Sequence, residues 1–266
     1  MRLITLTTDF GCLNHYTGVM KGVILSRAPE ARIVDLCHTI RAHDVRQAAL
    51  MIAANYRYFP TGSIHVLVVD PGVGGSRRIL LLNAAGHYFL APDNGLLSLV
   101  VQDAHGIRVF ETKRPDLYLQ PLSRTFHGRD IFAPLAAHLA QDNHIDGLGP
   151  ELDPARLTRL DLPRPTIDRR RKQIAGLVID IDHFGNIITN ITSDTINEFT
   201  DNPENVVVTL GGRSLRHLAA SYDGVSVGLP LLIINSASYL EIAVNQGRAG
   251  DYFQVEPGAK VLLQAG

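Results

Sequence analysis

Continuously apolar strands separated by helical stretches most constrain the fold of this chain. Residues 63–70, SIHVLVVD, are almost uniformly apolar toward their end. A strand with one face in water alternates apolar and polar residues, so this pattern predicts a strand that is buried on both faces. Further strands are expected at residues 3–9 and 32–38. Residues 44–59 repeat apolar side chains at helical spacing, with Asp44 as the expected N-cap. The pattern predicts an α/β fold with a mainly parallel sheet and flanking helices.

The pattern changes after about Leu160. Residues 161–173, DLPRPTIDRRRKQ, are rich in proline and charge, which is typical of a linker. Short strand-like segments with turn residues between them follow, and only SDTINEF resembles a helical turn. We therefore expect an N-terminal α/β domain over residues 1–162, a linker at about 163–172, and a smaller β domain over 173–266, either a barrel or a sandwich.

Charge and cysteine content exclude several classes of protein. The formal net charge is −1, so there is no basic excess of the kind that nucleic-acid binding requires. Cys12 and Cys37 are the only cysteines and lie in no zinc-ligand spacing, which favours a reducing compartment. No apolar run is long enough to cross a membrane, and no signal peptide is recognisable. We expect a cytoplasmic protein without nucleic-acid or membrane partners.

Polar side chains follow three of the predicted strands. Asp9, His38 and Asp70 each stand where a strand ends, and glycines follow both aspartates. Ligands of parallel sheets bind outside the carboxyl ends of the strands, so Asp9 and Asp70 are expected at the same edge. An isolated aspartate at such a place is more often a helix cap or a turn residue. Two of them at one edge favour a binding site.

The glycines after Asp70 match neither a dinucleotide fingerprint nor a phosphate loop. The turn DPGVGG could fold Arg77 back onto Asp70, although a surface pair of Arg77 and Arg78 explains the same letters about equally well. In RTFHGRD, His127 is the group that titrates near neutral pH, and it precedes an expected helix start at Asp130. A single histidine is usually structural, but its polar loop favours a site.

The second domain contains the dense stretch DIDHFGNIITNI. Strand alternation places Asp180 and Asp182 on one face and His183 on the other, which argues against a metal site. The letters FGN fit a plain hairpin turn, but Phe184 and Asn186 could also hold a flat heterocycle by stacking and an amide hydrogen bond. The stretch INSASYLEIAVNQGRA supplies Ser236, Glu241 and Asn245 in the same way.

Seven stretches occur in the order seen in a known family: TTDFG, VDLCH, VVDPGVGGSRR, APDNGLL, TFHGRD, IDHFGNIITNI and NSASYLEIA. Nearly the whole chain thereby resembles the S-adenosylmethionine hydroxide adenosyltransferases, also called adenosine-forming S-adenosylmethionine hydrolases, which are related to the S-adenosylmethionine-dependent fluorinase and chlorinase. The resemblance implies a C-terminal β-barrel and a homotrimer whose ligand lies between the N-terminal domain of one subunit and the C-terminal domain of its neighbour.

The resemblance also implies roles for individual residues. Asp70, Arg77 and His127 match the residues that position water. Asp9 would hold the ribose hydroxyls. The remaining residues belong to the second domain. Asp182 would bind the methionine ammonium, and Ser236 would contact the methionine end. The adenine pocket would be lined by Phe184, Asn186 and Tyr222.

The implied reaction is attack of water or hydroxide on the ribose C5′ of S-adenosylmethionine, with neutral methionine as the leaving group. Arg77 could favour hydroxide, and either Asp70 or His127 could take the proton. No metal and no cofactor is required. Two alternatives remain open: a halogenase with the same substrate, against which Asp70 argues because a carboxylate repels a halide, and a non-catalytic binder of S-adenosylmethionine or adenosine. A metal-dependent hydrolase lacks supporting ligand spacing.

Overall fold

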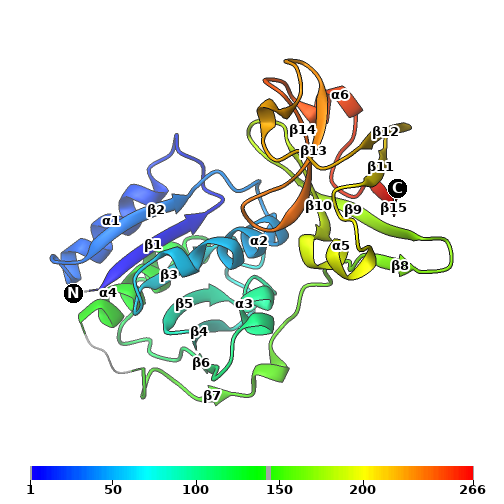
Figure 1. Ribbon diagram of the computed structural model, residues 1–266. Coiled ribbons are helices and arrows are strands. Elements are labelled where there is room, and N and C mark those ends of the chain that lie inside the picture. The colour runs from blue at the N-terminus through cyan, green and yellow to red at the C-terminus, as the bar shows by residue number, and fades with distance from the viewer. Residues whose placement is uncertain (1, 142–144, 266) are drawn as a thin grey trace. The chain divides into compact units, whose positions relative to one another are not determined.

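The computed structural model describes residues 2–141 and 145–265. The chain divides between Asp161 and Leu162 into two compact units, each with its own sheet. Figure 1 labels the elements of both units, which are described here one at a time.

The described residues of the first unit form one seven-stranded sheet in the order β2-β1-β3-β5-β4-β6-β7. Its strands are β1 (Leu3–Thr8), β2 (Arg32–Cys37), β3 (Ile64–Val68), β4 (Ile79–Ala84), β5 (His87–Pro92), β6 (Arg108–Glu111) and β7 (Glu151–Leu152). The first four strands in this order pair in parallel, and the remaining pairs are antiparallel. The sheet is therefore mixed and not mainly parallel. The cause is the tight turn at Ala85 and Gly86, both with positive φ, which joins β4 directly to β5 as an antiparallel hairpin.

Helices cover both faces of this sheet, as the apolar strands predicted. Along β3, Val66 packs into the core on the side of α1 and α4, whereas Leu67 packs into the core on the side of α2 and α3. Asp44 caps α2 by accepting a hydrogen bond from the Gln47 N–H, as predicted. The helices are α1 (Tyr16–Arg27), α2 (Val45–Asn55), α3 (Ser98–Asp103) and α4 (Ala133–Gln141), with short 3-10 turns at Tyr56–Tyr58 and Pro154–Arg156 and a π-helical turn at Gly128–Phe132.

The second unit is an antiparallel, nearly closed barrel. The strand order is β12-β11-β15-β9-β10-β14-β13, with β8 on the side of β9, and a bridge between Leu218 and Leu232 connects the two ends of this order. The strands are β8 (Thr166–Asp168), β9 (Gln173–Ile181), β10 (Ile187–Thr192), β11 (Val206–Leu210), β12 (Arg213–Arg216), β13 (Pro230–Ile234), β14 (Tyr239–Val244) and β15 (Lys260–Ala265). The expected fold class, an α/β unit plus a smaller β-barrel, is confirmed.

Two features of the second unit differ from expectation. The stretch expected as a linker contains β8, which pairs with β9, because Asp168 accepts hydrogen bonds from the N–H groups of Arg170 and Arg171 and turns the chain into a hairpin. Besides α5 (Ser193–Phe199) and a 3-10 turn at Tyr222–Gly224, a helix α6 (Ala249–Phe253) is present. Five residues give too little periodicity for a pattern to reveal it.

No helix in the described part of the chain is long and apolar enough to cross a membrane.

A buried pair of histidines lies within the first unit. His65 on β3 is fully buried, with Nδ1 2.8 Å from Thr5 Oγ1 and Nε2 3.3 Å from His87 Nδ1. Its ring stacks on Phe89. Burial, with a further contribution from the charge of His87, lowers the pKa of His65 to about 3, and burial also lowers the pKa of His87. Both imidazoles are therefore neutral in the folded protein at neutral pH.

We expect the free energy of unfolding to fall as the pH drops below about 6.5, the ordinary pKa of histidine. In this range His65 binds a proton in the unfolded chain but stays neutral in the folded protein. The loss continues until the folded-state pKa near 3 is reached, and His65 alone accounts for about 2 kcal/mol at pH 5. Urea unfolding at pH 7 and pH 5, followed by circular dichroism, measures this loss. His65→Gln should reduce it, whereas His105→Gln at an exposed position should not. An equal loss in all three proteins would contradict the assignment.

Candidate active site

Two aspartates stand at the carboxyl ends of neighbouring parallel strands in the first sheet. Strands β1 and β3 are parallel neighbours, and Thr8 pairs with Val68. Asp9 and Asp70 follow these paired positions by one and two residues, so both stand at the carboxyl ends of their strands. The edge that the sequence predicted for them is confirmed.

Arg77 joins Asp70 to His127. Its Nε lies 3.0 Å and 2.9 Å from the two carboxylate oxygens of Asp70, and its Nη2 lies 2.5 Å from Asp70 Oδ2. The same Nη2 lies 2.8 Å from His127 Nδ1. The three side chains thus form a continuous row of carboxylate, guanidinium and imidazole, assembled from two loops.

The glycine turn after β3 makes this row possible. The Val73 N–H donates to the Asp70 carbonyl and the Gly75 N–H donates to the Gly72 carbonyl, which turns the chain back toward Asp70. Gly74 has φ +76°, and a Cβ there would lie 2.2 Å from the carbonyl oxygen of Arg124. Only glycine lets this turn approach the loop that carries His127 so closely.

The row is largely shielded from water. The side chain of Asp70 is 4% exposed and that of Arg77 is 11% exposed. Removing a carboxylate and a guanidinium from water is costly unless the pair is well matched, and the contact of Arg77 with both oxygens of Asp70 supplies that match. The pair is therefore fixed in one geometry, and its charges act in a medium that screens them weakly.

His127 is neutral in this environment. Burial lowers its pKa, and the positive charge of Arg77 lowers it further, against the opposing charges of Asp70 and Asp130. Because Arg77 can only donate, Nδ1 of His127 must be the acceptor, and the imidazole proton then belongs to Nε2. The row thus places a neutral imidazole beside a matched ion pair.

The neighbouring arginine has a different partner. Arg78 donates to Asp93 from Nε at 2.7 Å and from Nη2 at 2.5 Å, and its Nη2 also donates to the carbonyl of Arg156 at 2.7 Å. It therefore ties the segment before the second unit to the sheet. The surface pair considered from the sequence is not what the structure contains, because each of the two arginines has its own carboxylate.

Asp130 holds the loop that carries His127. Its carboxylate accepts from the Ser123 N–H at 2.8 Å and from Arg129 Nε at 2.5 Å, and it is almost fully buried. His127 in turn hydrogen-bonds to the backbone of Ser123. The sequence suggested Asp130 only as a helix start. It gave no signal for this clamp, because the bond to Ser123 reaches backward across the loop.

Asp9 is held from the loop between β2 and α2. Its Oδ2 accepts from the backbone N–H of His43 at 2.9 Å, and His43 adopts φ +67°. The Asp9 side chain is only 10% exposed. It is therefore a fixed carboxylate at the edge where ligands of parallel strands bind.

In the second unit, Asp182 and Asn186 close the turn between β9 and β10. Asp182 accepts from the Asn186 N–H at 2.8 Å and from Asn186 Nδ2 at 3.0 Å. Phe184 is at the tip of this turn and is 72% exposed. Asp182 lies just beyond the end of β9, so it belongs to the turn and not to the strand face expected from alternation.

Tyr222 lies near the same carboxylate. Its hydroxyl donates to Glu241 Oε1 at 2.8 Å. Burial raises the pKa of Tyr222 to about 12, together with the charges of Glu241 and Asp182. Burial also raises the pKa of Glu241, and the charge of Asp182 adds to this. The structure thus brings Asp182, Tyr222 and Glu241 together, and sequence reasoning singled out Glu241 only as one polar residue of its strand.

Ser236 and Asn245 are not part of this cluster. Ser236 is exposed in the turn between β13 and β14, where Asn235 Oδ1 accepts from the N–H groups of Ala237 and Tyr239. Asn245 donates to the carbonyl of Val225 at 2.7 Å and so supports a loop.

Among the residues that the structure describes, no group of three or more His, Cys, Asp or Glu side chains is arranged to hold a metal ion.

We expect the pKa of His127 to lie below its ordinary value in the intact protein and to rise in Arg77→Met. The variant removes a positive charge that opposes protonation and leaves Asp70, whose charge favours it. NMR titration of 13C-labelled histidine measures both values, and His127→Asn identifies the signal by its loss. An unchanged His127 titration in Arg77→Met would show that the guanidinium does not control this imidazole.

The amino-acid sequence of this chain is similar to those of several named proteins. The chain is 36% identical over 264 residues to an (R)-S-adenosyl-L-methionine hydrolase of Salinispora arenicola, covering 99% of this chain and 98% of the relative. It is 36% identical over 271 residues to a protein of the same name from Thermus thermophilus, covering 99% and 100%. A fluorinase of Nocardia brasiliensis matches at 26% identity over 292 residues, covering 99% and 97%.

A solved structure and the family models agree with these matches. An uncharacterized conserved protein from Thermotoga maritima superimposes with a TM-score of 0.90 at 34% identity, covering 98% of this chain and 99% of the other. The model of the SAM hydroxide adenosyltransferase N-terminal domain matches residues 4–149, and that of the C-terminal domain matches residues 176–262. The chain belongs to the SAM (S-adenosyl-L-methionine) hydroxide adenosyltransferase family.

Proposed function

We propose that this protein hydrolyses S-adenosyl-L-methionine to adenosine and L-methionine, by attack of water or hydroxide on the ribose C5′. The observation that carries the proposal is the buried row of Asp70, Arg77 and His127 in a chain that belongs to this family. Two full-length relatives at 36% identity carry the name of this hydrolase.

The chemistry asks little of the protein besides a placed nucleophile. The leaving group is a sulfonium, which departs as neutral methionine without needing a proton. The remaining task is to hold water in line with the C5′–S bond, which is a problem of orientation. Arg77 lowers the cost of forming hydroxide nearby, and Asp70 and His127 fix the direction of Arg77. Because both oxygens of Asp70 contact Arg77, we assign the whole row to activation of the water. The proton that the attacking water loses would pass to Asp70 or His127 and from there to solvent.

Substrate binding is proposed for residues of both units. Asp9 would accept hydrogen bonds from the ribose hydroxyls, which suits a fixed carboxylate at the sheet edge. Asp182 would meet the methionine ammonium, and its position beside the carboxyl of Glu241 supports a preference for cations. The adenine would lie against Phe184 and Tyr222, near Asn186, and Ser236 would contact the methionine end. The exposure of Phe184 supports its part, since a buried ring could not stack on a ligand.

We further propose a cytoplasmic homotrimer that acts without metal or other cofactor. The site would lie at the interface between subunits, with no nucleic-acid or membrane partner. Family resemblance supports the trimer and the interface. The low net charge supports the absence of a nucleic-acid partner, and the presence of only two cysteines supports a reducing compartment such as the cytoplasm.

We expect the purified protein to convert S-adenosyl-L-methionine to equal amounts of adenosine and methionine in the presence of EDTA. Chromatography measures both products, and magnesium or zinc added in place of EDTA should not increase the rate. In high chloride we expect no 5′-chloro-5′-deoxyadenosine, because the row would hold water at the position in line with C5′ that a halide would need. Formation of the chlorinated nucleoside would favour the halogenase alternative. Intact substrate with the protein folded and ligand bound would favour the binder.

Arg77→Lys should lower kcat by about 10² or more, because an ammonium cannot contact both Asp70 and His127 as the planar guanidinium does. The matched control is Arg78→Lys, whose guanidinium pairs with Asp93 and not with the row. Steady-state kinetics of the two variants test the assignment. Equal activity of Arg77→Lys and wild type would remove Arg77 from the mechanism.

A further inference from the structure

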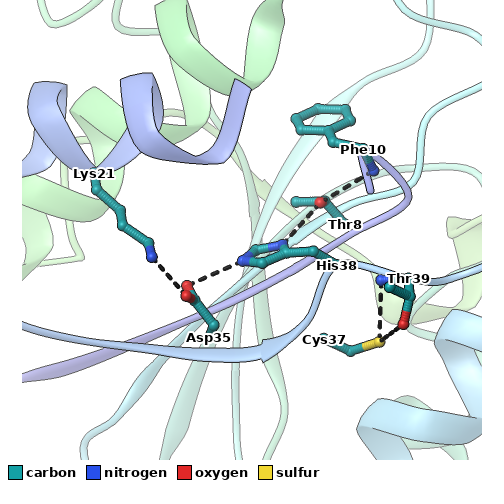
Figure 2. Close-up of polar contacts among 7 residues, drawn as sticks. All are labelled: Thr8, Phe10, Lys21, Asp35, Cys37, His38 and Thr39. Carbon is teal, nitrogen blue, oxygen red and sulfur yellow. Dashed lines mark hydrogen bonds and ion pairs between the residues drawn. The ribbon is translucent and has the colours of Figure 1, made fainter. Parts of the chain in front are cut away.

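A second row of polar contacts lies in the first unit and ends at Thr8 and Phe10, the residues on either side of Asp9. Figure 2 shows it: Lys21 Nζ lies 2.5 Å from Asp35 Oδ2, and His38 Nε2 lies 3.0 Å from Asp35 Oδ1. On the other side of the ring, His38 Nδ1 lies 2.9 Å from Thr8 Oγ1, which accepts from the Phe10 N–H at 3.2 Å. The row therefore connects α1, the end of β2 and the end of β1.

The contacts give the row one consistent direction. The Thr8 hydroxyl already accepts from the Phe10 N–H, so its own proton can go to His38 Nδ1. On the opposite side of the ring, Nε2 then faces Asp35. Burial opposes ionisation of Asp35, but the hydrogen bonds and charges of Lys21 and His38 outweigh it, so the pKa of Asp35 lies below its ordinary value. Asp35 is thus held by Lys21 and lies close to His38, and His38 is held by Thr8.

The order of carboxylate, imidazole and hydroxyl is that of a serine-hydrolase triad, but the row cannot work as one. Thr8 is fully buried within the first sheet, so no substrate carbonyl can reach its hydroxyl. Its hydroxyl also holds the backbone of Phe10. Any role of the row in function must therefore come from fixing the position of the backbone segment that it contacts.

That chain segment is the one that presents Asp9. The His38 ring holds Thr8, and the His38 carbonyl accepts from the Gly11 N–H at 2.7 Å. His38 therefore makes hydrogen bonds on both sides of Asp9, to Thr8 and to Gly11. Five residues further on, the His43 N–H donates to the Asp9 carboxylate itself. The loop that follows β2 thus contacts the Asp9 carboxylate and the residues on either side of Asp9.

The same segment also reaches the loop of His127. The ring of Phe10 packs edge-to-face against Phe126 and Tyr16. A Cβ at Gly128 would lie 3.4 Å from the Phe10 ring, so the ring packs against Phe126 on one side of His127 and lies close to the space beside Gly128 on the other. A shift of Phe10 would therefore disturb the loop of His127 as well.

We propose that His38, oriented by Asp35, is a positioning residue that fixes the Asp9 carboxylate for recognition of the vicinal diol of a nucleoside. The inference rests on the proposed function, because that function places the ribose at Asp9. It adds to that function a determinant of selectivity for ribose that lies on a neighbouring strand and does not touch the ligand.

The test compares binding of adenosine with binding of 2′,3′-dideoxyadenosine by isothermal titration calorimetry. The variants are His38→Gln and Asp35→Asn, and the control is Lys21→Met, which removes the other partner of the same carboxylate. Wild type should prefer adenosine by about 30-fold, the effect of one or two hydrogen bonds to a charged group. Both variants should reduce this preference at least about fivefold, mainly by weakening adenosine, and Lys21→Met should keep it.

Each outcome separates the claims. A purely structural role of the row would weaken both nucleosides equally and leave the preference unchanged, which would overturn the inference while hydrolysis by wild type still supports the proposed function. Because Asp35→Asn changes a partly exposed side chain, it keeps the test valid even where His38→Gln folds poorly. In a double-mutant cycle, His38→Gln should have no further effect on the preference in Asp9→Asn, and additive effects would contradict the inference. If wild type binds no adenosine and leaves S-adenosyl-L-methionine intact, the proposed function fails, and the inference fails with it.

Discussion

The guanidinium of Arg77 is the group on which the first unit's site depends. It is shared between a carboxylate at the end of β3 and an imidazole from a loop fifty residues later in the chain. Its fixed plane lets it contact both oxygens of Asp70 and still reach His127, which an ammonium could not do. Its charge helps to keep His127 neutral, and without it a buried carboxylate would stand unpaired, at a cost of several kcal/mol.

The parallel pairing of β1 and β3 supplies the frame for this interaction. It brings Asp9 and Asp70 to the same end of the sheet, and the tight approach of Gly74 to Arg124 brings the His127 loop to the loop that follows Asp70. The loop after β2 then contacts Thr8 through His38 and Asp9 through His43. The site of the first unit is thus built from strand ends that depend on one another. We expect substitutions within it to be non-additive for the same reason.

Sequence reasoning succeeds where the geometry is regular. The shared edge of Asp9 and Asp70 follows from parallel strands, and the α2 cap at Asp44 follows from local hydrogen bonding. It is weaker where contacts are long-range. Spacing did not decide whether Arg77 pairs with Asp70, since the turn DPGVGG is compatible both with that pair and with an exposed Arg77.

Other features could not be found from sequence patterns. The tie between Arg77 and His127, the clamp of Asp130 on Ser123 and the approach of Tyr222 to Glu241 depend on how loops pack. His38 was visible only as a polar strand end, because its partner Thr8 reads as an ordinary strand residue.

The central claim is that water attacks the ribose C5′ under control of the Asp70, Arg77 and His127 row. Turnover in water enriched in oxygen-18, with mass spectrometry of the products, tests it most directly. The account predicts one solvent oxygen in the 5′-hydroxyl of adenosine and none in methionine, with no labelled adenosine from an Asp70→Ala variant. Unlabelled adenosine, or label incorporated equally well by that variant, would contradict it.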